Sequence, residues 1–447
     1  MGQPVEIGNL EAIMDWVGLT FILFGILLVL LVVGIPVAFA MGMTAAIMVV
    51  TFLSPNMLVQ MARVSFAVST NHLFLVAPLF VLMAALVSHS DIAEKSFRAA
   101  TKWFSWMPGA LPASTVVACT AFSAISGSSP ATAAAIGYAA VPEIRKAGHS
   151  KRLAVGVVAA GGTLGILIPP SVVLVIYGIL TETSIGSLFI AGILPGLLLA
   201  ALMVLYSVVY SIREGTARTV NFRPSWSERF GALQGIWPIL MLFVIVMGAI
   251  YTGIATTTEA AALGAAGALL LTIHRVDMRH KGLNRVLIKT AETTTMLMLL
   301  IIFGSFFGFV VSRLGIAHGM VEAVLAAGLD PWLILALYLG GLLLLGCVMD
   351  PASMMVITLP LAFPVLQELG FDPIWLGVLV TITVEIGMIT PPVGLNLFVL
   401  KGIVPQDITM SDIMLGAAPF VLIMIIGLLI IILFPPIATF LPSLMSK

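Results

Sequence analysis

The sequence predicts an all-α, polytopic membrane protein built from two inverted repeats, and three observations support this prediction. Only 9% of the 447 residues are charged, against about 25% in an ordinary soluble domain, while 60% are hydrophobic. The apolar residues form long continuous runs, which favour spanning helices over the alternating strands of a barrel. Landmark residues of the first half recur in the second. A soluble enzyme, a nucleic-acid binder and a disordered scaffold are therefore excluded.

Ten apolar stretches of about 18 to 27 residues are long enough to cross a hydrocarbon core of roughly 30 Å. They begin near Trp16, Pro36, Asn71, Arg152, Ser187, Trp237, Thr257, Thr290, Ile374 and Ile413. Two further apolar regions, 108–147 and 331–370, are interrupted by turn residues at 126–130 and at 349–351. Each of these two regions is predicted to be a re-entrant hairpin rather than a pair of crossings.

Lysine and arginine residues gather in four loops, which the positive-inside rule places on the cytoplasmic side. These loops hold Lys95, Arg98 and Lys102; Arg145, Lys146, Lys151 and Arg152; Arg213, Arg218, Arg223 and Arg229; and Arg275, Arg279, Lys281, Arg285 and Lys289. The acidic N-terminal residues Glu6, Glu11 and Asp15 suit the outer side. All four loops share one side only if the first hairpin enters from the cytoplasm and the second from outside. Both chain termini are then predicted to lie outside.

Matching residues recur in the two halves of the sequence at a nearly constant offset. The segment GILIPP at 165–170 matches GMITPP at 387–392, which lies 222 positions later. At offsets of 221 to 224, Pro142 pairs with Pro364, Gly148 with Gly370, Pro130 with Pro351, Ile92 with Ile316, and Pro195 with Pro419. An odd number of crossings in each copy makes the repeat inverted.

This register predicts the organisation of the chain. The first repeat is expected at 1–210, with its hairpin at 108–147 and a Pro-Pro broken helix at 152–178. A cytoplasmic linker at 211–235 follows. The second repeat is expected at 236–447, with its hairpin at 331–370 and its broken helix at 374–400. Each repeat would contain five transmembrane helices and one hairpin.

Helices are predicted to break at membrane depth at both hairpin tips and at both Pro-Pro pairs. Ser129, Asp350 and Thr390 each precede a proline and are expected to cap the following half-helix, whereas the break at Ile168 lacks such a residue. The N-terminus of a half-helix offers N–H groups to an anion, and a C-terminal end offers carbonyls to a cation. This arrangement is typical of a transporter that couples an anionic solute to a cation.

The polar residues at the breaks are the candidate ligands. The Ser-Gly-Ser-Ser tip at 126–129 supplies oxygen atoms for a hard cation or a carboxylate, although serine and glycine are also common turn fillers. Asp350 is expected either to coordinate a cation or to cap its helix, because a carboxylate at membrane depth is costly. Asn396 can donate and accept hydrogen bonds to a solute, or it can join two helices. Glu259 is interpreted as a structural charge, and Glu385 is expected to orient the break.

Five segments resemble those of the large membrane subunit of tripartite ATP-independent periplasmic (TRAP) transporters. They are 124–134, 165–170, 256–262, 349–351 and 385–396, and the resemblance extends over essentially the whole chain. It implies an elevator-type carrier, in which a transport domain with both hairpins and both broken helices slides against a scaffold. It also implies sodium-driven symport of an organic acid, such as a dicarboxylate, across the bacterial inner membrane. The implied partners are a periplasmic solute-binding protein and a small four-helix membrane subunit.

Within this interpretation, the candidate residues fall into two groups. The solute carboxylate is expected between the two tips, where it would contact Ser128, Ser129, Thr132, Pro170 and Asn396. Na⁺ is expected at the first tip with Ser126, Gly127 and Gly165, and at the second with Asp350, Thr390 and Gly394. No GxxxxGK[ST] motif is present, so ATP is not expected as an energy source. The short acidic segment before the first span indicates a small subunit on a separate polypeptide, and both termini are expected in the periplasm.

Three alternatives compete with this hypothesis. The first is a stand-alone carboxylate carrier or antiporter, coupled to Na⁺ or H⁺ and working without a binding protein. The second is an intramembrane hydrolase with Ser128 or Ser129 as nucleophile, which lacks a histidine in a plausible position to act as base. The third is a channel, which fits broken helices around occluded sites less well than alternating access does.

Overall fold

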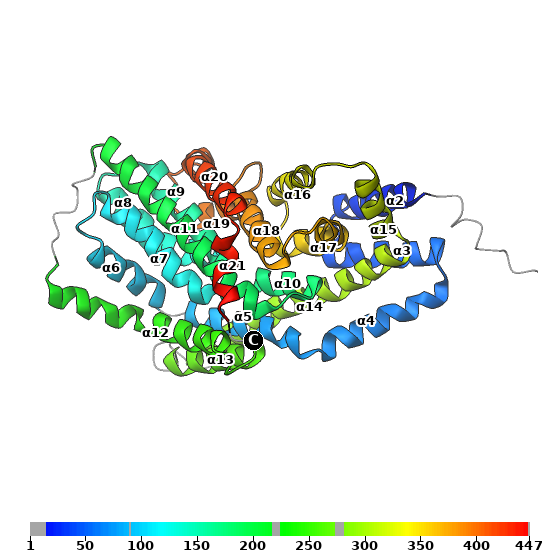
Figure 1. Cartoon of the computed structure of the whole chain (residues 1–447). Helices are drawn as coiled ribbons and strands as arrows, with labels where there is room; N and C mark the ends of the chain where they lie inside the picture. Colours follow the sequence, from blue (N-terminus) through cyan, green and yellow to red (C-terminus); the bar gives the residue numbers. More distant parts are fainter. Residues whose placement is uncertain (1–14, 89–90, 217–223, 273–280, 446–447) are drawn as a thin grey trace, which may run out of the picture.

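The computed structural model describes residues 15–88, 91–216, 224–272 and 281–445, and every regular element in these ranges is helical. The all-α prediction is therefore confirmed (Figure 1). The elements of the first half are α2 (Trp16–Val32), α3 (Val37–Phe52), η1 (Pro55–Leu58), α4 (Val59–Thr70), η2 (His72–Leu75), α5 (Val76–Ser88), α6 (Ile92–Trp103), α7 (Ala110–Ser126), α8 (Ser129–Lys146), α9 (Lys151–Leu167), α10 (Val172–Thr181) and α11 (Ile185–Arg213). Those of the second half are α12 (Trp226–Tyr251), α13 (Thr257–Thr272), α14 (Lys281–Arg313), α15 (Ile316–Ala326), α16 (Pro331–Gly346), α17 (Pro351–Glu368), α18 (Pro373–Met388), α19 (Leu395–Ile403), α20 (Met410–Leu433) and α21 (Pro436–Ser443).

Among the described residues, four single helices are long and apolar enough to cross a membrane: α11, α12, α14 and α20. Two bent pairs add up to two further spans, α4 with α5 at 60° and α9 with α10 at 40°. The crossing predicted from Asn71 is thus the second arm of a bent pair. The bend lies at Asn71, whose side chain accepts a hydrogen bond from the Leu73 N–H and so caps the next turn.

Two of the long helices begin earlier than their apolar stretches. Helix α12 starts at Trp226 instead of near Trp237, because Ser225 and Glu228 form a capping box in polar sequence. Helix α14 likewise starts at Lys281 instead of near Thr290, since hydropathy marks only the apolar part of a helix. The predicted linker at 211–235 is therefore helical at both ends. Arg218, Arg223, Arg275, Arg279, Glu6 and Glu11 lie outside the described residues.

The two helices that precede the Pro-Pro pairs form the centre of the molecule. All residues of α9 from Leu153 to Leu167 and all residues of α18 from Trp375 to Met388 are buried. Helix α9 packs against α7, α8, α11, α18 and α20, and Figure 1 shows this group on the side of the molecule opposite α2, α3 and α15. Glycine and alanine line α9, which allows neighbouring backbones to approach closely.

The contact between α9 and α20 depends on one glycine pair. A methyl group added to Gly156 of α9 would lie 2.2 Å from the carbonyl oxygen of Gly416 in α20. The same addition at Gly416 would lie 2.3 Å from the Arg152 carbonyl oxygen. Backbone atoms cannot rotate away as a side chain can, so the two helices would have to separate.

We expect Gly156→Ala to destabilise the protein by about 1 to 3 kcal/mol, the usual cost of overpacking. Gly25→Ala is the matched control, because nothing lies within 4 Å of an added methyl group there. The control should be neutral or gain up to about 1 kcal/mol from helix propensity. Thermal unfolding in detergent measures both variants, and equal unfolding temperatures would contradict the proposed packing.

Candidate functional site

The first hairpin tip is a two-residue turn closed by its own hydrogen bonds. Helix α7 ends at Ser126, and Gly127 follows in the left-handed region at φ 56°. The Ser126 hydroxyl lies 2.6 Å from the Thr132 hydroxyl and accepts a hydrogen bond from the Ser128 N–H at 3.3 Å. Ser128 contributes only backbone atoms to these bonds. Its partly exposed hydroxyl is therefore available for other contacts.

This tip lies directly on the first Pro-Pro break. A methyl group added to Gly127 would lie 2.6 Å from the Pro170 carbonyl oxygen. One added to Gly165 would lie 2.9 Å from the Ser128 carbonyl oxygen and from the Thr132 hydroxyl. Both glycines are needed for this close approach. The structure thus brings together five of the residues that the sequence singled out, from two separate segments.

Two capping predictions at this site were wrong. Ser129 is the first residue of α8, with Ser128 at the N-cap, and the Ser129 hydroxyl donates to the Thr163 carbonyl of α9 at 2.9 Å. The break at Ile168 does have a cap, because Ser171 accepts a hydrogen bond from the Leu174 N–H. Pro169 and Pro170 lie in the gap between α9 and α10 and not in the first turn of α10. The N-cap residue of α10, Ser171, therefore follows both prolines.

The second tip has a different cap chemistry. Asp350 precedes α17, and its carboxylate accepts hydrogen bonds from the N–H and the hydroxyl of Ser353. The capping interpretation of Asp350 is confirmed. Its side chain is only partly buried, so the carboxylate also has access to a ligand.

The second tip also lies on its own helix break. The Cys347 carbonyl accepts hydrogen bonds from the N–H groups of Val393 and Gly394, at 3.2 and 3.1 Å. Gly346 and Gly387 are in close contact, since a methyl group added to Gly387 would lie 2.6 Å from the Gly346 Cα. Backbone groups freed by the break are thereby satisfied by the hairpin.

The capping prediction for Thr390 was wrong. The residue lies in the turn that follows α18, and its hydroxyl donates to the Ile386 carbonyl at 2.6 Å. Gly394, in the left-handed region at φ 63°, occupies the N-cap of α19 without a side-chain bond. The second break is thus longer than the first. It is also more open, because Pro391 and Pro392 are exposed.

Asn396 and Glu385 are the two buried polar side chains beside the second break. Both are 0% exposed, and no hydrogen-bond partner exists for any of their side-chain oxygen or nitrogen atoms in the described structure. The interhelical hydrogen bond considered for Asn396 is therefore absent from the described residues. Glu385 faces the N–H groups of Ile166 and Leu167 outside hydrogen-bond geometry. A buried amide without a partner is costly, which makes Asn396 available to a ligand.

The two tip-and-break assemblies pack against each other crosswise. Helix α8 of the first hairpin packs on α19 of the second break, and α17 of the second hairpin packs on α10 of the first break. Helices α9 and α18 are in contact between them. Asn396 is thus carried on a half-helix that packs against the first hairpin.

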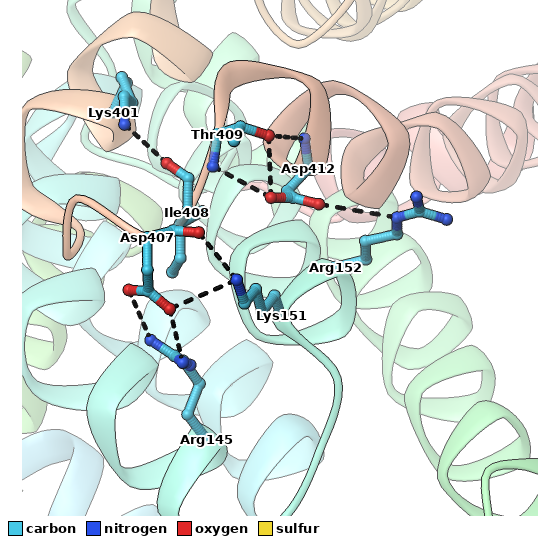
Figure 2. A network of polar contacts seen from close by, with 8 residues as sticks. All are labelled: Arg145, Lys151, Arg152, Lys401, Asp407, Ile408, Thr409 and Asp412. Atoms are coloured by element: carbon cyan, nitrogen blue, oxygen red, sulfur yellow. Dashed lines mark hydrogen bonds and ion pairs between the residues drawn. The ribbon is translucent and has the colours of Figure 1, made fainter.

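A cluster of ion pairs fixes the far end of α19, and sequence reasoning missed it. Figure 2 shows Asp407, in the loop between α19 and α20, held by two basic residues. Arg145 contacts both carboxylate oxygens at 3.0 and 2.7 Å, and Lys151 donates to the Asp407 carbonyl at 2.8 Å. Asp412 lies 3.9 Å from Arg152 in the same cluster. These contacts tie the base of the first hairpin to the loop behind α19.

Comparison with known proteins identifies the family. The profile of the DctM component of tripartite ATP-independent periplasmic transporters matches residues 24–437. The chain belongs to this family. The resemblance drawn from the motifs is therefore confirmed, and a large permease of this kind is one component of a tripartite transport system.

Two relatives are similar in sequence to this chain over nearly its whole length. It is 36% identical to the C4-dicarboxylate TRAP transporter large permease protein DctM of Vibrio cholerae, over 95% of this chain and 97% of that one. It is 32% identical to the isethionate TRAP transporter permease protein DctMQ of Oleidesulfovibrio alaskensis, over 96% of this chain and 67% of that one. The crystal structure of the Alcanivorax borkumensis YdaH transporter has a similar fold, with a TM-score of 0.59 at 15% identity over 87% and 88% of the two chains.

We expect Ser129→Ala to lower stability by about 1 kcal/mol, because it removes the buried hydrogen bond from the Ser129 hydroxyl to the Thr163 carbonyl. Ser128→Ala, one residue away on the same tip, should leave the unfolding temperature unchanged. Thermal unfolding of the two purified variants distinguishes them. Equal losses would show that the Ser129 hydroxyl does not hold the tip on α9.

The Asp407 cluster predicts a defined dependence on pH. The hydrogen bond from Arg145 lowers the pKa of Asp407 from its ordinary value of 3.8. The stabilisation is thus fully present above pH 3.8 and is lost as the pH falls through the lowered value. Asp407→Asn should unfold at a lower temperature than the wild type near neutral pH, and this difference should disappear in acid. A difference that is independent of pH would exclude the ion pair as its source.

Proposed function

We propose that this chain is the large permease subunit of a sodium-coupled, binding-protein-dependent secondary transporter that imports a small organic acid across the bacterial inner membrane. One observation supports this most directly: each hairpin tip lies on a helix break, and the buried amide of Asn396 beside the second break lacks a partner. Membership of the DctM family agrees with this function. The expected partners are a periplasmic solute-binding protein and a small four-helix membrane subunit.

The solute carboxylate is proposed to bind between the two tips. Ser128 and Asn396 offer groups that are not used within the described structure. Ser129 and Thr132 are already bonded to Thr163 and Ser126, so their role would be to hold the tip in place. The N-terminus of α8, which has no side-chain cap, would offer N–H groups to the carboxylate. C4-dicarboxylate and isethionate, which two relatives carry in their names, are organic anions.

Na⁺ is proposed as the coupling ion, with a candidate site at each tip. The first would use oxygen atoms of Ser126, Gly127 and Gly165. The second would use oxygen atoms of Asp350, Thr390 and Gly394. Hydroxyl groups that donate a hydrogen bond keep their lone pairs for a cation, and oxygen ligands are the kind that hard cations prefer. The solute and the ions would then share the same two breaks.

An elevator movement between inverted repeats is proposed for the transport step. The repeats would comprise 1–210 and 236–447, with both termini in the periplasm. The two hairpins and the two broken helices would move as one transport domain. The crosswise packing of α8 on α19 and of α17 on α10 supports this, because it links the two halves into one body.

The test is uptake of a radiolabelled C4-dicarboxylate such as succinate into proteoliposomes that contain the chain, the small subunit and the cognate binding protein. We expect uptake only with an inward Na⁺ gradient and with the binding protein present. Full uptake driven by a proton gradient without sodium would overturn the coupling. Full uptake without the binding protein would instead favour a stand-alone carrier.

Two variants separate the roles of the tip residues in the same assay. Asp350→Asn retains a good N-cap, so the protein should stay folded while the Na⁺ concentration for half-maximal uptake rises about tenfold or more. Asn396→Ala should instead raise the KM for the solute at saturating Na⁺. An Asp350→Asn variant with unchanged Na⁺ dependence would restrict Asp350 to capping.

A further inference from the structure

A large cavity lies beside the basic helix α6, outside the proposed transport site. Its volume is about 1140 Å³, and it lies between α6, α8 and α12. The apolar part of its lining comprises Phe97, Ala99, Leu111, Ala135, Ala139, Pro142, Ala232 and Trp237. The polar part comprises Glu94, Lys95, Arg98, Thr101, Lys102, Tyr138, Glu143 and Gln234. The cavity therefore has an apolar wall and a charged rim.

The rim carries a stripe of positive charge. Lys95, Arg98 and Lys102 follow each other at spacings of three and four residues, so they share one face of α6. Helix α6 is buried through Ile92, Phe97 and four small residues, and Phe97 also lines the cavity. A basic stripe of this kind on an amphipathic helix fits a phosphate group.

The acidic residues of the rim do not cancel this charge. Lys95 pairs with Asp91, and Arg98 pairs with Glu94, one helical turn away in each case. These are exposed pairs of little energetic weight, which a phosphate can replace. Glu143 is paired with Lys146 at 2.8 Å. Lys102 lines the cavity and makes no ion pair within 4.0 Å among the described residues, although its charge acts on the Glu228 carboxylate at the start of α12.

Exposed aromatic side chains around this cavity indicate that it lies at the border between lipid and water. Trp106 is 70% exposed, Tyr138 77%, Trp226 66% and Phe230 59%. Exposed tryptophan and tyrosine at such density are typical of the headgroup level of a bilayer. The Trp103 indole donates to the Arg229 carbonyl at 3.0 Å, which joins the end of α6 to the start of α12. The cavity is thus built between helices at the headgroup level, not in the bundle centre.

We propose that this cavity binds one anionic phospholipid, with its phosphate on Lys95, Arg98 and Lys102 and an acyl chain along the apolar wall. The positive-inside rule places α6 on the cytoplasmic side, where anionic lipids are attracted to basic pockets between helices. A soluble anion would use the basic rim but would leave the wall formed by Phe97, Leu111 and Trp237 without a partner. The bound lipid contacts α8, an arm of the first hairpin, together with α12. The inference does not depend on the transported solute.

The test is retention of lipid by the full chain during delipidation in detergent, measured by native mass spectrometry with dioleoyl phosphatidylglycerol or dioleoyl phosphatidylcholine added. We expect the wild type to retain at least fivefold more phosphatidylglycerol than phosphatidylcholine. The variant Lys95→Gln/Arg98→Gln/Lys102→Gln should lose this preference. The matched control Arg63→Gln/Arg285→Gln/Lys289→Gln removes the same charge from exposed positions elsewhere and should keep it.

Two further arms separate the remaining explanations. Ala135→Trp fills the apolar part of the cavity without changing charge and should also reduce retention. Soluble glycerol 3-phosphate and succinate at the same concentration should not displace the lipid. Equal retention of the two lipids, equal behaviour of the two triple variants, or displacement by either soluble anion would overturn the proposal.

Discussion

The structure depends on one constraint: a backbone that leaves helical geometry inside a membrane must find new partners for its N–H and C=O groups. Both breaks have a hairpin tip packed directly on the broken helix, but the partners differ: the Cys347 carbonyl accepts from the second break, whereas Ser171 caps the half-helix after the first. Glycines make this packing possible, because a single methyl group at Gly127, Gly165 or Gly387 would collide with backbone or with a hydroxyl. The close contact between tip and break therefore requires glycine at these positions.

The polar chemistry of the site follows from this fit. Once a tip satisfies a break, most hydroxyl groups are committed to internal bonds, as Ser129 is to Thr163 and Thr390 to Ile386. Few polar groups near the breaks are left without a hydrogen-bond partner in the described structure. The side-chain amide of Asn396 is the clearest example. A site built this way recognises a ligand with few groups, because the surrounding polar atoms already have partners and cannot rearrange without cost.

The two ends of the central helices are held by different forces. On the side of the 145–152 loop, charged contacts around Asp407 tie the first hairpin to the loop that follows α19. Near the start of α18, a neutral hydrogen bond of 2.7 Å from the Tyr177 hydroxyl to the Pro373 carbonyl joins the two halves. Exposed ion pairs and neutral bonds are each modest in strength. The centre is therefore stabilised mainly by the burial and close packing of α9 and α18.

The sequence by itself determined the class of the protein, its family and the positions at which helices break. These features are local: apolar runs, paired prolines and small polar tips can be recognised without knowing what they touch. It misassigned the caps at Ser129 and Thr390 and missed the cap at Ser171. The N-cap of α8 lies one residue earlier, at Ser128, and after each Pro-Pro pair the next half-helix begins beyond the prolines, at a residue that the proline positions alone do not give. Only the tertiary structure decided which hydroxyls are occupied, that Asp407 pairs with Arg145 across 262 positions, and that α19 packs on the first hairpin. Such contacts join distant segments, and their energies depend on burial and distance, which no local pattern contains.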